Sequence, residues 1–558
     1  MLALAIFAAA AALWVRQIGL VGEVAIGWGL GRPPAVLLSV DPPIWADGSV
    51  TPSGGSAWGP LVASQVRPIE ALRLGPLWLP LAVNSYTGGP ADWPARLLFA
   101  LTGSLAAVGA LHVALGGGLI ALAHRFVRAW GGEIAAGITA LLLATDAGFL
   151  FYRKALGGTE LLLQLAGMMC LWGLWSRRWA GGRWALLIFA AGVGLGILAK
   201  ITFVITLGAL LGAALLTRWD KPALRPPLPR RWWAGGVVVL LLTAPLWIAA
   251  IHQALGVPAE PHVLSHDFPG LQLDRVAGFL SAQDTPARER WSNLSYWAGN
   301  PYAFLAPAYG ATPLPAWGPL RVLAWGALAA GVALAWRRRV ASKGEALIRF
   351  LSVYLALQVA LLLVVARDLH HLAQATPTLA LLGGLAIERL AATSTPARSI
   401  PRARDALLLA LPWLVTGLYA SARADAALAS IPAPSFTAGG QEDLVGLLVK
   451  ADARRVVTCD YELYGALDLL APGVRFEHAW AAASRSWQMD DGRDTLLAAL
   501  LRRAEGAHLL IVKPTVPMIY NLSPGPARVL RTAEKEGLHA RIVGQLPDEA
   551  AVLYAVEP

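Results

Sequence analysis

A short polar segment between two apolar stretches places two cations close to a carboxylate. It runs Phe151-Tyr-Arg-Lys-Ala-Leu-Gly-Gly-Thr-Glu160 and holds Arg153, Lys154 and Glu160. Ionisable groups beside or within a bilayer are costly, and they often mark functional sites. We expect the two cations to hold an anionic headgroup and Glu160 to orient a hydroxyl or a cation-binding partner. The structural alternative is that the cations extend to the interface while Glu160 stabilises a helix start.

Two more segments carry cations suited to an anion. Arg367-Asp-Leu-His-His371 joins Arg367 to His370 and His371, and charge and hydrogen bonding together suit a phosphate group. Lys200 lies between two apolar runs and suits the same kind of ligand. The alternatives are a solvated turn with Arg367 paired to its neighbouring aspartate, and a lysine that extends to the interface. We predict no metal site, because adjacent histidines rarely bind one ion without distant ligands; a divalent metal has no support in the sequence.

Three carboxylates near the N-terminus are candidate general bases: Glu23, Asp41 and Asp47. A carboxylate with a suitably tuned pKa can deprotonate a hydroxyl acceptor at neutral pH. Asp47 precedes a glycine, which is a common turn pair, whereas Glu23 directly follows the first apolar stretch. Spacing alone does not choose among the three.

The composition excludes an ordinary soluble protein. Of 558 residues, 56% are hydrophobic and only 15% are charged, so the positioning elements must be membrane helices. A span needs about 20 mostly apolar residues. Eleven stretches are candidate spans: 2–19, 97–122, 134–151, 159–175, 184–199, 201–216, 235–256, 318–336, 347–366, 374–392 and 405–422.

Arginine and lysine collect in every second gap between these spans. The basic gaps are 123–132, 176–183, 217–233, 337–349 and 393–404. Basic loops stay on the cytoplasmic side of a membrane, which predicts a cytoplasmic N-terminus and an inner (plasma) membrane protein whose C-terminus is periplasmic. The net charge of +11 is therefore attributed to contacts with membrane lipid rather than nucleic acid.

We predict a polytopic α-helical membrane domain over 1–422 and a small α/β domain over 423–558. The first outer loop, 20–95, is expected to include one or two interfacial helices around 67–82, and 257–317 forms a large outer loop. In the C-terminal domain, strand-like and helix-like stretches alternate, which is typical of an α/β layer. The strands are expected at 455–459, 474–478, 508–513, 539–544 and 551–556, and the helices at 461–470, 494–505 and 526–537.

The order of these segments resembles the GT-C superfamily of membrane glycosyltransferases. Within it, the chain is most similar to the glycosyltransferase family 39 and protein-mannosyltransferase-like branch. The likeness covers residues 1 to about 392 and is carried by Pro76-Leu-Trp-Leu-Pro running into Trp93-Pro-Ala-Arg96, by Ala140-Leu-Leu-Leu-Ala-Thr-Asp146 before Tyr152-Arg153, by Gly194-Leu-Gly-Ile-Leu-Ala-Lys200, and by Arg367-Asp-Leu-His-His371.

The resemblance implies a GT-C-like fold and an inverting hexosyl- or pentosyltransferase that uses a polyprenyl-phosphate-linked sugar donor. It implies an acidic base in the first outer loop, where Glu23 stands in the position of the family's acid. Glu23, Asp41, Asp47 and Glu160 are then the catalytic candidates. The donor phosphate would meet Arg153, Lys154, Lys200, Arg367, His370 and His371, and the acceptor would be a glycan, lipid or protein.

Two alternatives stay open. One is a transporter or flippase for a lipid-linked or anionic solute, although such proteins place ionisable groups near the bilayer midplane, and here these groups lie at span ends. The other is a non-catalytic GT-C-like scaffold, since the chain has Gly22-Glu23 where the family has an Asp-Glu pair.

Overall fold

The structure is a computed structural model, and it describes the residues that form most of the helices and strands. These are 71–74, 77–80, 93–102, 105–146, 149, 159–180, 184–200, 202–217, 288, 291, 294, 297–298, 318–337, 342–365, 369–394, 399–430, 438–458, 474–478, 492–512 and 524–558.

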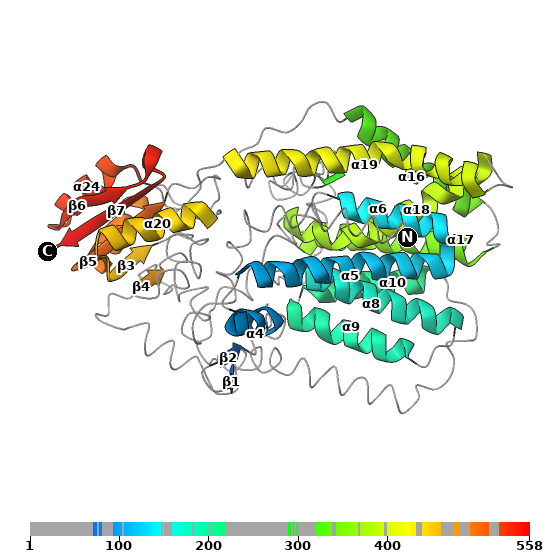
Figure 1. Ribbon diagram of the computed structural model, residues 1–558, viewed down its shortest axis with the longest axis horizontal. Helices are drawn as coiled ribbons and strands as arrows, with labels where there is room; N and C mark the ends of the chain where they lie inside the picture. The colour runs from blue at the N-terminus through cyan, green and yellow to red at the C-terminus, as the bar shows by residue number, and fades with distance from the viewer. Residues whose placement is uncertain are drawn as a thin grey trace.

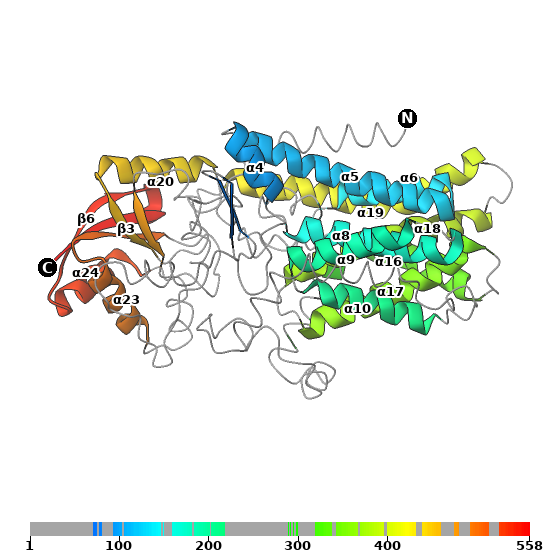
Figure 2. The same ribbon diagram turned by 90° about the horizontal axis from the view of Figure 1, so that it is seen from below.

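A bundle of long apolar helices makes up the larger part of the described chain (Figures 1 and 2). In chain order the helices are α4 (Trp93–Thr102), α5 (Leu105–Gly131), α6 (Glu133–Thr145), α8 (Thr159–Ala180), α9 (Ala185–Ala199), α10 (Phe203–Leu216), α16 (Gly318–Arg337), α17 (Lys343–Val365), α18 (Thr376–Ser394) and α19 (Ser399–Ser430). The 3-10 helix η6 (Leu369–Ala375) leads into α18. Among the described residues, Ala110–Gly131, Gly318–Arg337 and Lys343–Val364 are long and apolar enough to cross a membrane, and α6, α9 and α10 are shorter apolar helices.

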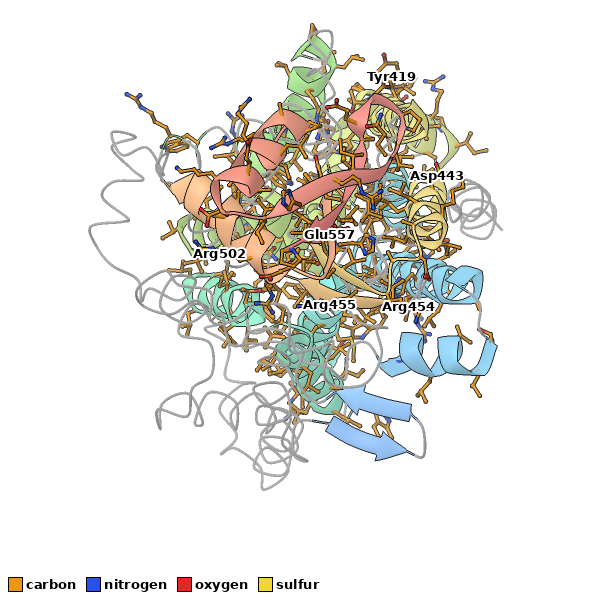
Figure 3. The ribbon with its side chains drawn as sticks, turned by 90° about the vertical axis from the view of Figure 1, so that its left-hand side faces the viewer. Tyr419, Asp443, Arg454, Arg455, Arg502 and Glu557 are labelled. Carbon is orange, nitrogen blue, oxygen red and sulfur yellow. The ribbon has the colours of Figure 1, made fainter. Side chains whose placement is uncertain are left out.

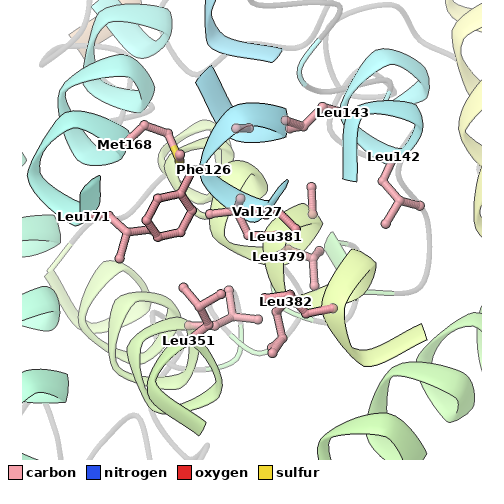
Figure 4. Packing of buried hydrophobic residues seen from close by; sticks show 14 of the residues in the cluster. Phe126, Val127, Leu142, Leu143, Met168, Leu171, Leu351, Leu379, Leu381 and Leu382 are labelled. Carbon is pink, nitrogen blue, oxygen red and sulfur yellow. The ribbon is translucent and has the colours of Figure 1, made fainter. Parts of the chain in front are cut away.

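The bundle core collects side chains from most of the long helices. Phe126 of α5, Leu143 of α6, Leu171 of α8, Leu351 of α17 and Leu381 of α18 converge in one cluster (Figure 4). Large apolar side chains also cover the outside of the bundle, for example Val322 at 70% exposure and Leu408 at 58%. A helix that is apolar on its inner and outer faces is suited to a lipid environment.

Successive helices reverse direction, so their junctions gather at two ends of the bundle. At the first end, which we call the arginine end, α5 meets α6, α8 meets α9, α16 meets α17 and α18 meets α19. At the second end, the Glu160 end, α8 begins, α9 meets α10, and α17 meets η6 and α18.

Ion pairs between neighbouring helices gather at the arginine end. Arg128 Nε lies 2.7 Å from Glu133 Oε2 across the α5–α6 junction. Arg389 of α18 pairs with Glu345 of α17, which is buried, and Arg402 of α19 pairs with Glu388 of α18. Arg128 and Arg402, which the sequence placed between spans, thus connect helices as well as marking their ends.

The C-terminal residues form a five-stranded sheet with helices on both faces (Figures 1 and 3). Its elements are α20 (Ala438–Lys450), β3 (Arg455–Thr458), β4 (Arg475–His478), α23 (Gly492–Arg503), β5 (Ala507–Val512), α24 (Pro526–Lys535), β6 (His539–Gln545) and β7 (Ala551–Glu557). The strand order is β4-β3-β5-β7-β6; β3 is parallel to β4 and β5, whereas β7 is antiparallel to β5 and β6.

Alternating side chains explain why this sheet is covered on both faces. Val457 packs with residues of α23 and α24, whereas its neighbour Val456 packs with residues of α20. In β5, Leu509 likewise packs with residues of α23 and α24, and Leu510 packs with residues of α20. Successive side chains of a strand point to opposite faces, so the continuous apolar runs of β3 and β5 fill two cores.

Several sequence expectations need correction. The predicted interfacial helices around 67–82 are wrong: β1 (Ala71–Leu74) and β2 (Leu77–Pro80) pair as an antiparallel hairpin. Leucine alternates in both strands, and the two residues between them are glycine and proline, which are poor helix formers.

Some predicted boundaries also differ from those of the structure. Instead of one helix over 97–122, α4 and α5 are separate, and α5 continues to Gly131 through the predicted basic gap. Basic side chains in the last turns of a helix reach the headgroup region without ending the helix. The helix α20 was not predicted. The spans 2–19 and 235–256, and the helix 461–470, lie outside the described residues.

Candidate functional site

Glu160 and Lys200 form an ion pair at the Glu160 end of the bundle. Lys200 Nζ lies 3.3 Å from Glu160 Oε1, and each side chain is only 10% exposed. The two residues are 40 positions apart in the chain, so two helix ends are needed to bring them together. They are the two predicted site residues whose side chains the structure describes, and they contact each other.

The local backbone explains how each residue reaches the pair. Glu160 lies in the first turn of α8. Lys200 caps the end of α9 in an extended conformation, with its N–H donating to the Gly196 carbonyl at 3.0 Å and its own carbonyl accepting from Phe203 N–H at 2.9 Å. Residues 200–202 separate α9 from α10, and Lys200 is the first of them.

Burial separates this pair from an ordinary surface ion pair. Two charges removed from water repay their desolvation only with good geometry and further hydrogen bonds. Both residues make additional interactions within the protein. Lys200 is accordingly held inside the bundle at 8% exposure, rather than extending to the interface as the structural alternative required.

The turn that contains His370 and His371 lies beside the same part of α8. Both belong to η6, and the next residues of η6 are bonded to α8: Gln164 Nε2 donates to the Ala373 carbonyl at 2.8 Å. Gln164 follows Glu160 by four positions, which places both on one face of the helix. The structure therefore brings the backbone of the two histidines to the helix face that carries Glu160, while their side chains lie outside the described residues.

The remaining predicted site residues lie outside the described part of the chain. They are Glu23, Asp41, Asp47, Arg153, Lys154 and Arg367. Among the described residues, no group of three or more histidine, cysteine, aspartate or glutamate side chains could hold a metal ion.

Arg321 is a buried cation that sequence reasoning missed. It lies in the first turn of α16 at 4% exposure, with its guanidinium 4.7 Å from the centre of the Trp413 ring. The negative charge of Asp146, at the end of α6, acts on it. Trp325 contacts the same Trp413 ring at 5.3 Å and donates its indole N–H to the Ala298 carbonyl at 2.7 Å. In sequence, Arg321 resembles any arginine at the start of a span, and only its burial distinguishes it.

Comparison with known proteins identifies the fold. No protein-family profile matches the sequence, and no curated protein sequence matches it. Among solved structures, ArnT from Cupriavidus metallidurans bound to undecaprenyl phosphate aligns over 99% of this chain and 97% of its own, with a TM-score of 0.55 and 13% identity. ArnT in the apo state aligns over the same shares, with a TM-score of 0.52 and 15% identity.

A third structure is similar at a lower score. The archaeal oligosaccharyltransferase AglB from Archaeoglobus fulgidus, in complex with an inhibitory peptide and a dolichol-phosphate, aligns over 91% of this chain and 69% of its own at 14% identity, with a TM-score of 0.46. The full-length alignment with the two ArnT structures confirms the resemblance drawn from the motifs at the level of the fold.

Proposed function

We propose that this chain, which has the GT-C fold of membrane glycosyltransferases, transfers a sugar from a polyprenyl-phosphate-linked donor to an acceptor. The observation that carries the proposal is the buried Glu160–Lys200 pair at the bundle end opposite the arginines. ArnT, which shares the fold, was solved bound to undecaprenyl phosphate. That lipid phosphate is the product expected when such a donor loses its sugar.

Lys200 is the cation that we assign to the donor phosphate. An ammonium group carries a positive charge and three donors, which suits a phosphate oxygen as well as the Glu160 carboxylate. Glu160 would hold the ammonium in place and set its direction. Electrostatic stabilisation of a leaving group is a large contribution to catalysis when the donors are fixed in advance, and a buried pair is fixed in this way.

In the proposed reaction the acceptor hydroxyl oxygen attacks the anomeric carbon. A carboxylate takes the hydroxyl proton as the new glycosidic bond forms. The bond between the anomeric carbon and the phosphate oxygen breaks, and the polyprenyl phosphate leaves with the electron pair. Attack from the side opposite the leaving group gives inversion. Glu23, Asp41 and Asp47 are our candidates for the base, and Arg153, Lys154, Arg367, His370 and His371 for further phosphate contacts.

We place the reaction on the outer face of the inner membrane. The Glu160 end lies opposite the arginine end, and basic segments stay in the cytoplasm. The sugar would be a hexose or a pentose, and the acceptor a glycan, lipid or protein. The C-terminal sheet would then be a periplasmic domain, within reach of an extracytoplasmic acceptor.

Activity of the full-length protein in lipid nanodiscs tests the proposal. Transfer from radiolabelled polyprenyl-phosphate sugars to mixed envelope acceptors is measured for the unmodified protein, Lys200→Met and Glu160→Gln. We expect both substitutions to lower kcat/KM by about 100-fold or more, the range found when one preorganised charge contact is removed.

Glu133→Gln is the matched control for Glu160→Gln. Glu133 also lies in the first turn of a helix and pairs with a cation, Arg128, but at the arginine end. It should keep full activity. Absence of transfer and of donor binding by the unmodified protein would overturn the proposal, and uptake or flipping of lipid-linked sugar by vesicles would favour a transporter instead.

A further inference from the structure

A chain of buried polar side chains links η6 to the surrounding helices. Gln358 of α17 donates from Nε2 to the Gln374 carbonyl at 3.1 Å and to Thr206 Oγ1 at 3.4 Å. Thr206 of α10 donates to Gln374 Oε1 at 3.0 Å, and Thr378 of α18 donates to Gln358 Oε1 at 3.0 Å. Together with the bond from Gln164 to Ala373, these contacts attach the end of η6 to α8, α10 and α17, and Thr378 of α18 joins the network through Gln358.

This network lies deep in the bundle. Thr206, Gln358, Gln374 and Thr378 are each at most 4% exposed. Moving a hydroxyl or amide out of water costs free energy even when hydrogen bonds compensate for part of it, and leucine or valine would fill the same space without that cost. Polar groups kept in an apolar bundle are therefore candidates for a functional role.

One atom of the network strengthens this interpretation. Gln374 Nε2 is buried and has no hydrogen-bond acceptor among the described residues. An unsatisfied buried donor costs free energy, so this nitrogen is a departure from complete pairing within the network. Departures from complete pairing are expected where function constrains the structure.

The element that the network holds needs external support. A 3-10 helix has poor hydrogen-bond geometry, and runs longer than three or four residues are uncommon. η6 has seven residues. Its C-terminal part is fixed by side chains from three helices, α8, α10 and α17, and its N-terminal part contains His370 and His371.

We propose that Thr206, Gln358 and Gln374 are positioning residues that hold η6 beside Glu160 and Lys200, so that both segments contact the same lipid phosphate. This role rests on the proposed function, because it names the ligand of that site. Its physical basis is geometric: hydrogen bonds fix distance and direction, whereas apolar packing would let η6 slide along α8.

Substitutions at Thr206 test the role with the full-length protein in nanodiscs. Thr206→Val keeps the side-chain shape but removes the hydroxyl, and Thr206→Ser restores it. The matched control is Thr416→Val: Thr416 is also buried, at 1% exposure, and its hydroxyl bonds to Trp413 within its own helix. Two quantities are measured: hydrogen exchange of the amides of residues 369–375, and binding of undecaprenyl phosphate.

Thr206→Val should speed exchange across η6 and weaken lipid-phosphate binding, each by about tenfold, as expected when the two buried hydrogen bonds of the Thr206 hydroxyl are lost. Thr206→Ser should reverse both changes, and Thr416→Val should cause neither. Unchanged exchange in η6, or faster exchange with unchanged binding, would overturn the positioning role alone. If the unmodified protein does not bind the lipid phosphate, the proposed function fails together with the assignment of this ligand.

Discussion

A buried carboxylate and a buried ammonium depend on each other for their stability as ions. Removing one partner of such a pair leaves an uncompensated charge, which typically costs about 3–5 kcal/mol, whereas replacing both partners is often nearly neutral. Glu160 and Lys200 are both about 10% exposed, so this asymmetry should apply to them.

We predict that Lys200→Met and Glu160→Gln each lower the melting temperature of the purified protein more than the double variant does. The coupling between the two substitutions measures the interaction of the pair. Strictly additive losses would show that the two residues act independently. The measurement is made in detergent and in nanodiscs without donor, so it does not depend on the proposed reaction.

The types of the site residues could be predicted from sequence, but their pairing could not. Lys200 and Glu160 were each recognised as ionisable groups at the edge of an apolar stretch, and each was assigned to a separate ligand. No local pattern reports a contact between helix ends 40 residues apart. Arg321 was missed for a related reason, because burial against Trp413 is a property of three packed helices rather than of the residues around it.

At the scale of elements, hydrophobic pattern predicted the existence of helices better than their ends. The described parts of nine predicted spans are helical, but α5, α8 and α19 run past their predicted limits through arginines. Charge marks where a span meets water, and the backbone hydrogen bonds of a helix continue through that boundary. The hairpin of β1 and β2 was missed because four-residue strands carry too little alternation to outweigh the expectation of an interfacial helix.

Close packing of α6 against α18 depends on glycine. A side chain at Gly384 would place its Cβ 2.6 Å from the Ala135 carbonyl oxygen, a backbone atom that cannot move aside. Small residues at helix contacts let backbones approach within membranes. Gly384→Ala should therefore destabilise the bundle by about 1–3 kcal/mol.

Gly326→Ala is the matched control, because an added Cβ at that position of α16 meets nothing within 4 Å. It should leave the protein unchanged or slightly more stable, since alanine favours helix over glycine. Thermal unfolding followed by circular dichroism measures both. Equal effects of the two substitutions would contradict the packing account.

At the scale of the whole molecule, the basic segments that alternate along the chain lie together at the arginine end of the bundle. We predict that the arginine end faces the cytoplasm and the C-terminal sheet faces outward. Both reporter cysteines are introduced into a Cys459→Ser variant, in which the remaining Cys170 is buried. Ala403→Cys reports the side of the membrane on which the arginine end lies, and Glu534→Cys reports the side of the C-terminal sheet. A membrane-impermeant maleimide should label Glu534→Cys in intact cells and Ala403→Cys only after the cells are opened. The reverse pattern would invert the topology.

The two ends of the bundle are bonded across helices by different kinds of contact. They join α5 to α6, α17 to α18 and α18 to α19, and Arg349 Nε also bonds the Ala335 carbonyl, linking α17 to α16 at 2.9 Å. Among the described residues, the neutral side-chain bonds between helices lie mainly at the other end, around η6. Both ends of the bundle are thus bonded across helices, by charged pairs at the arginine end and by neutral hydrogen bonds and the buried Glu160–Lys200 pair at the other. Because salt screens exposed charges much more than buried groups, the two ends should respond differently to ionic strength.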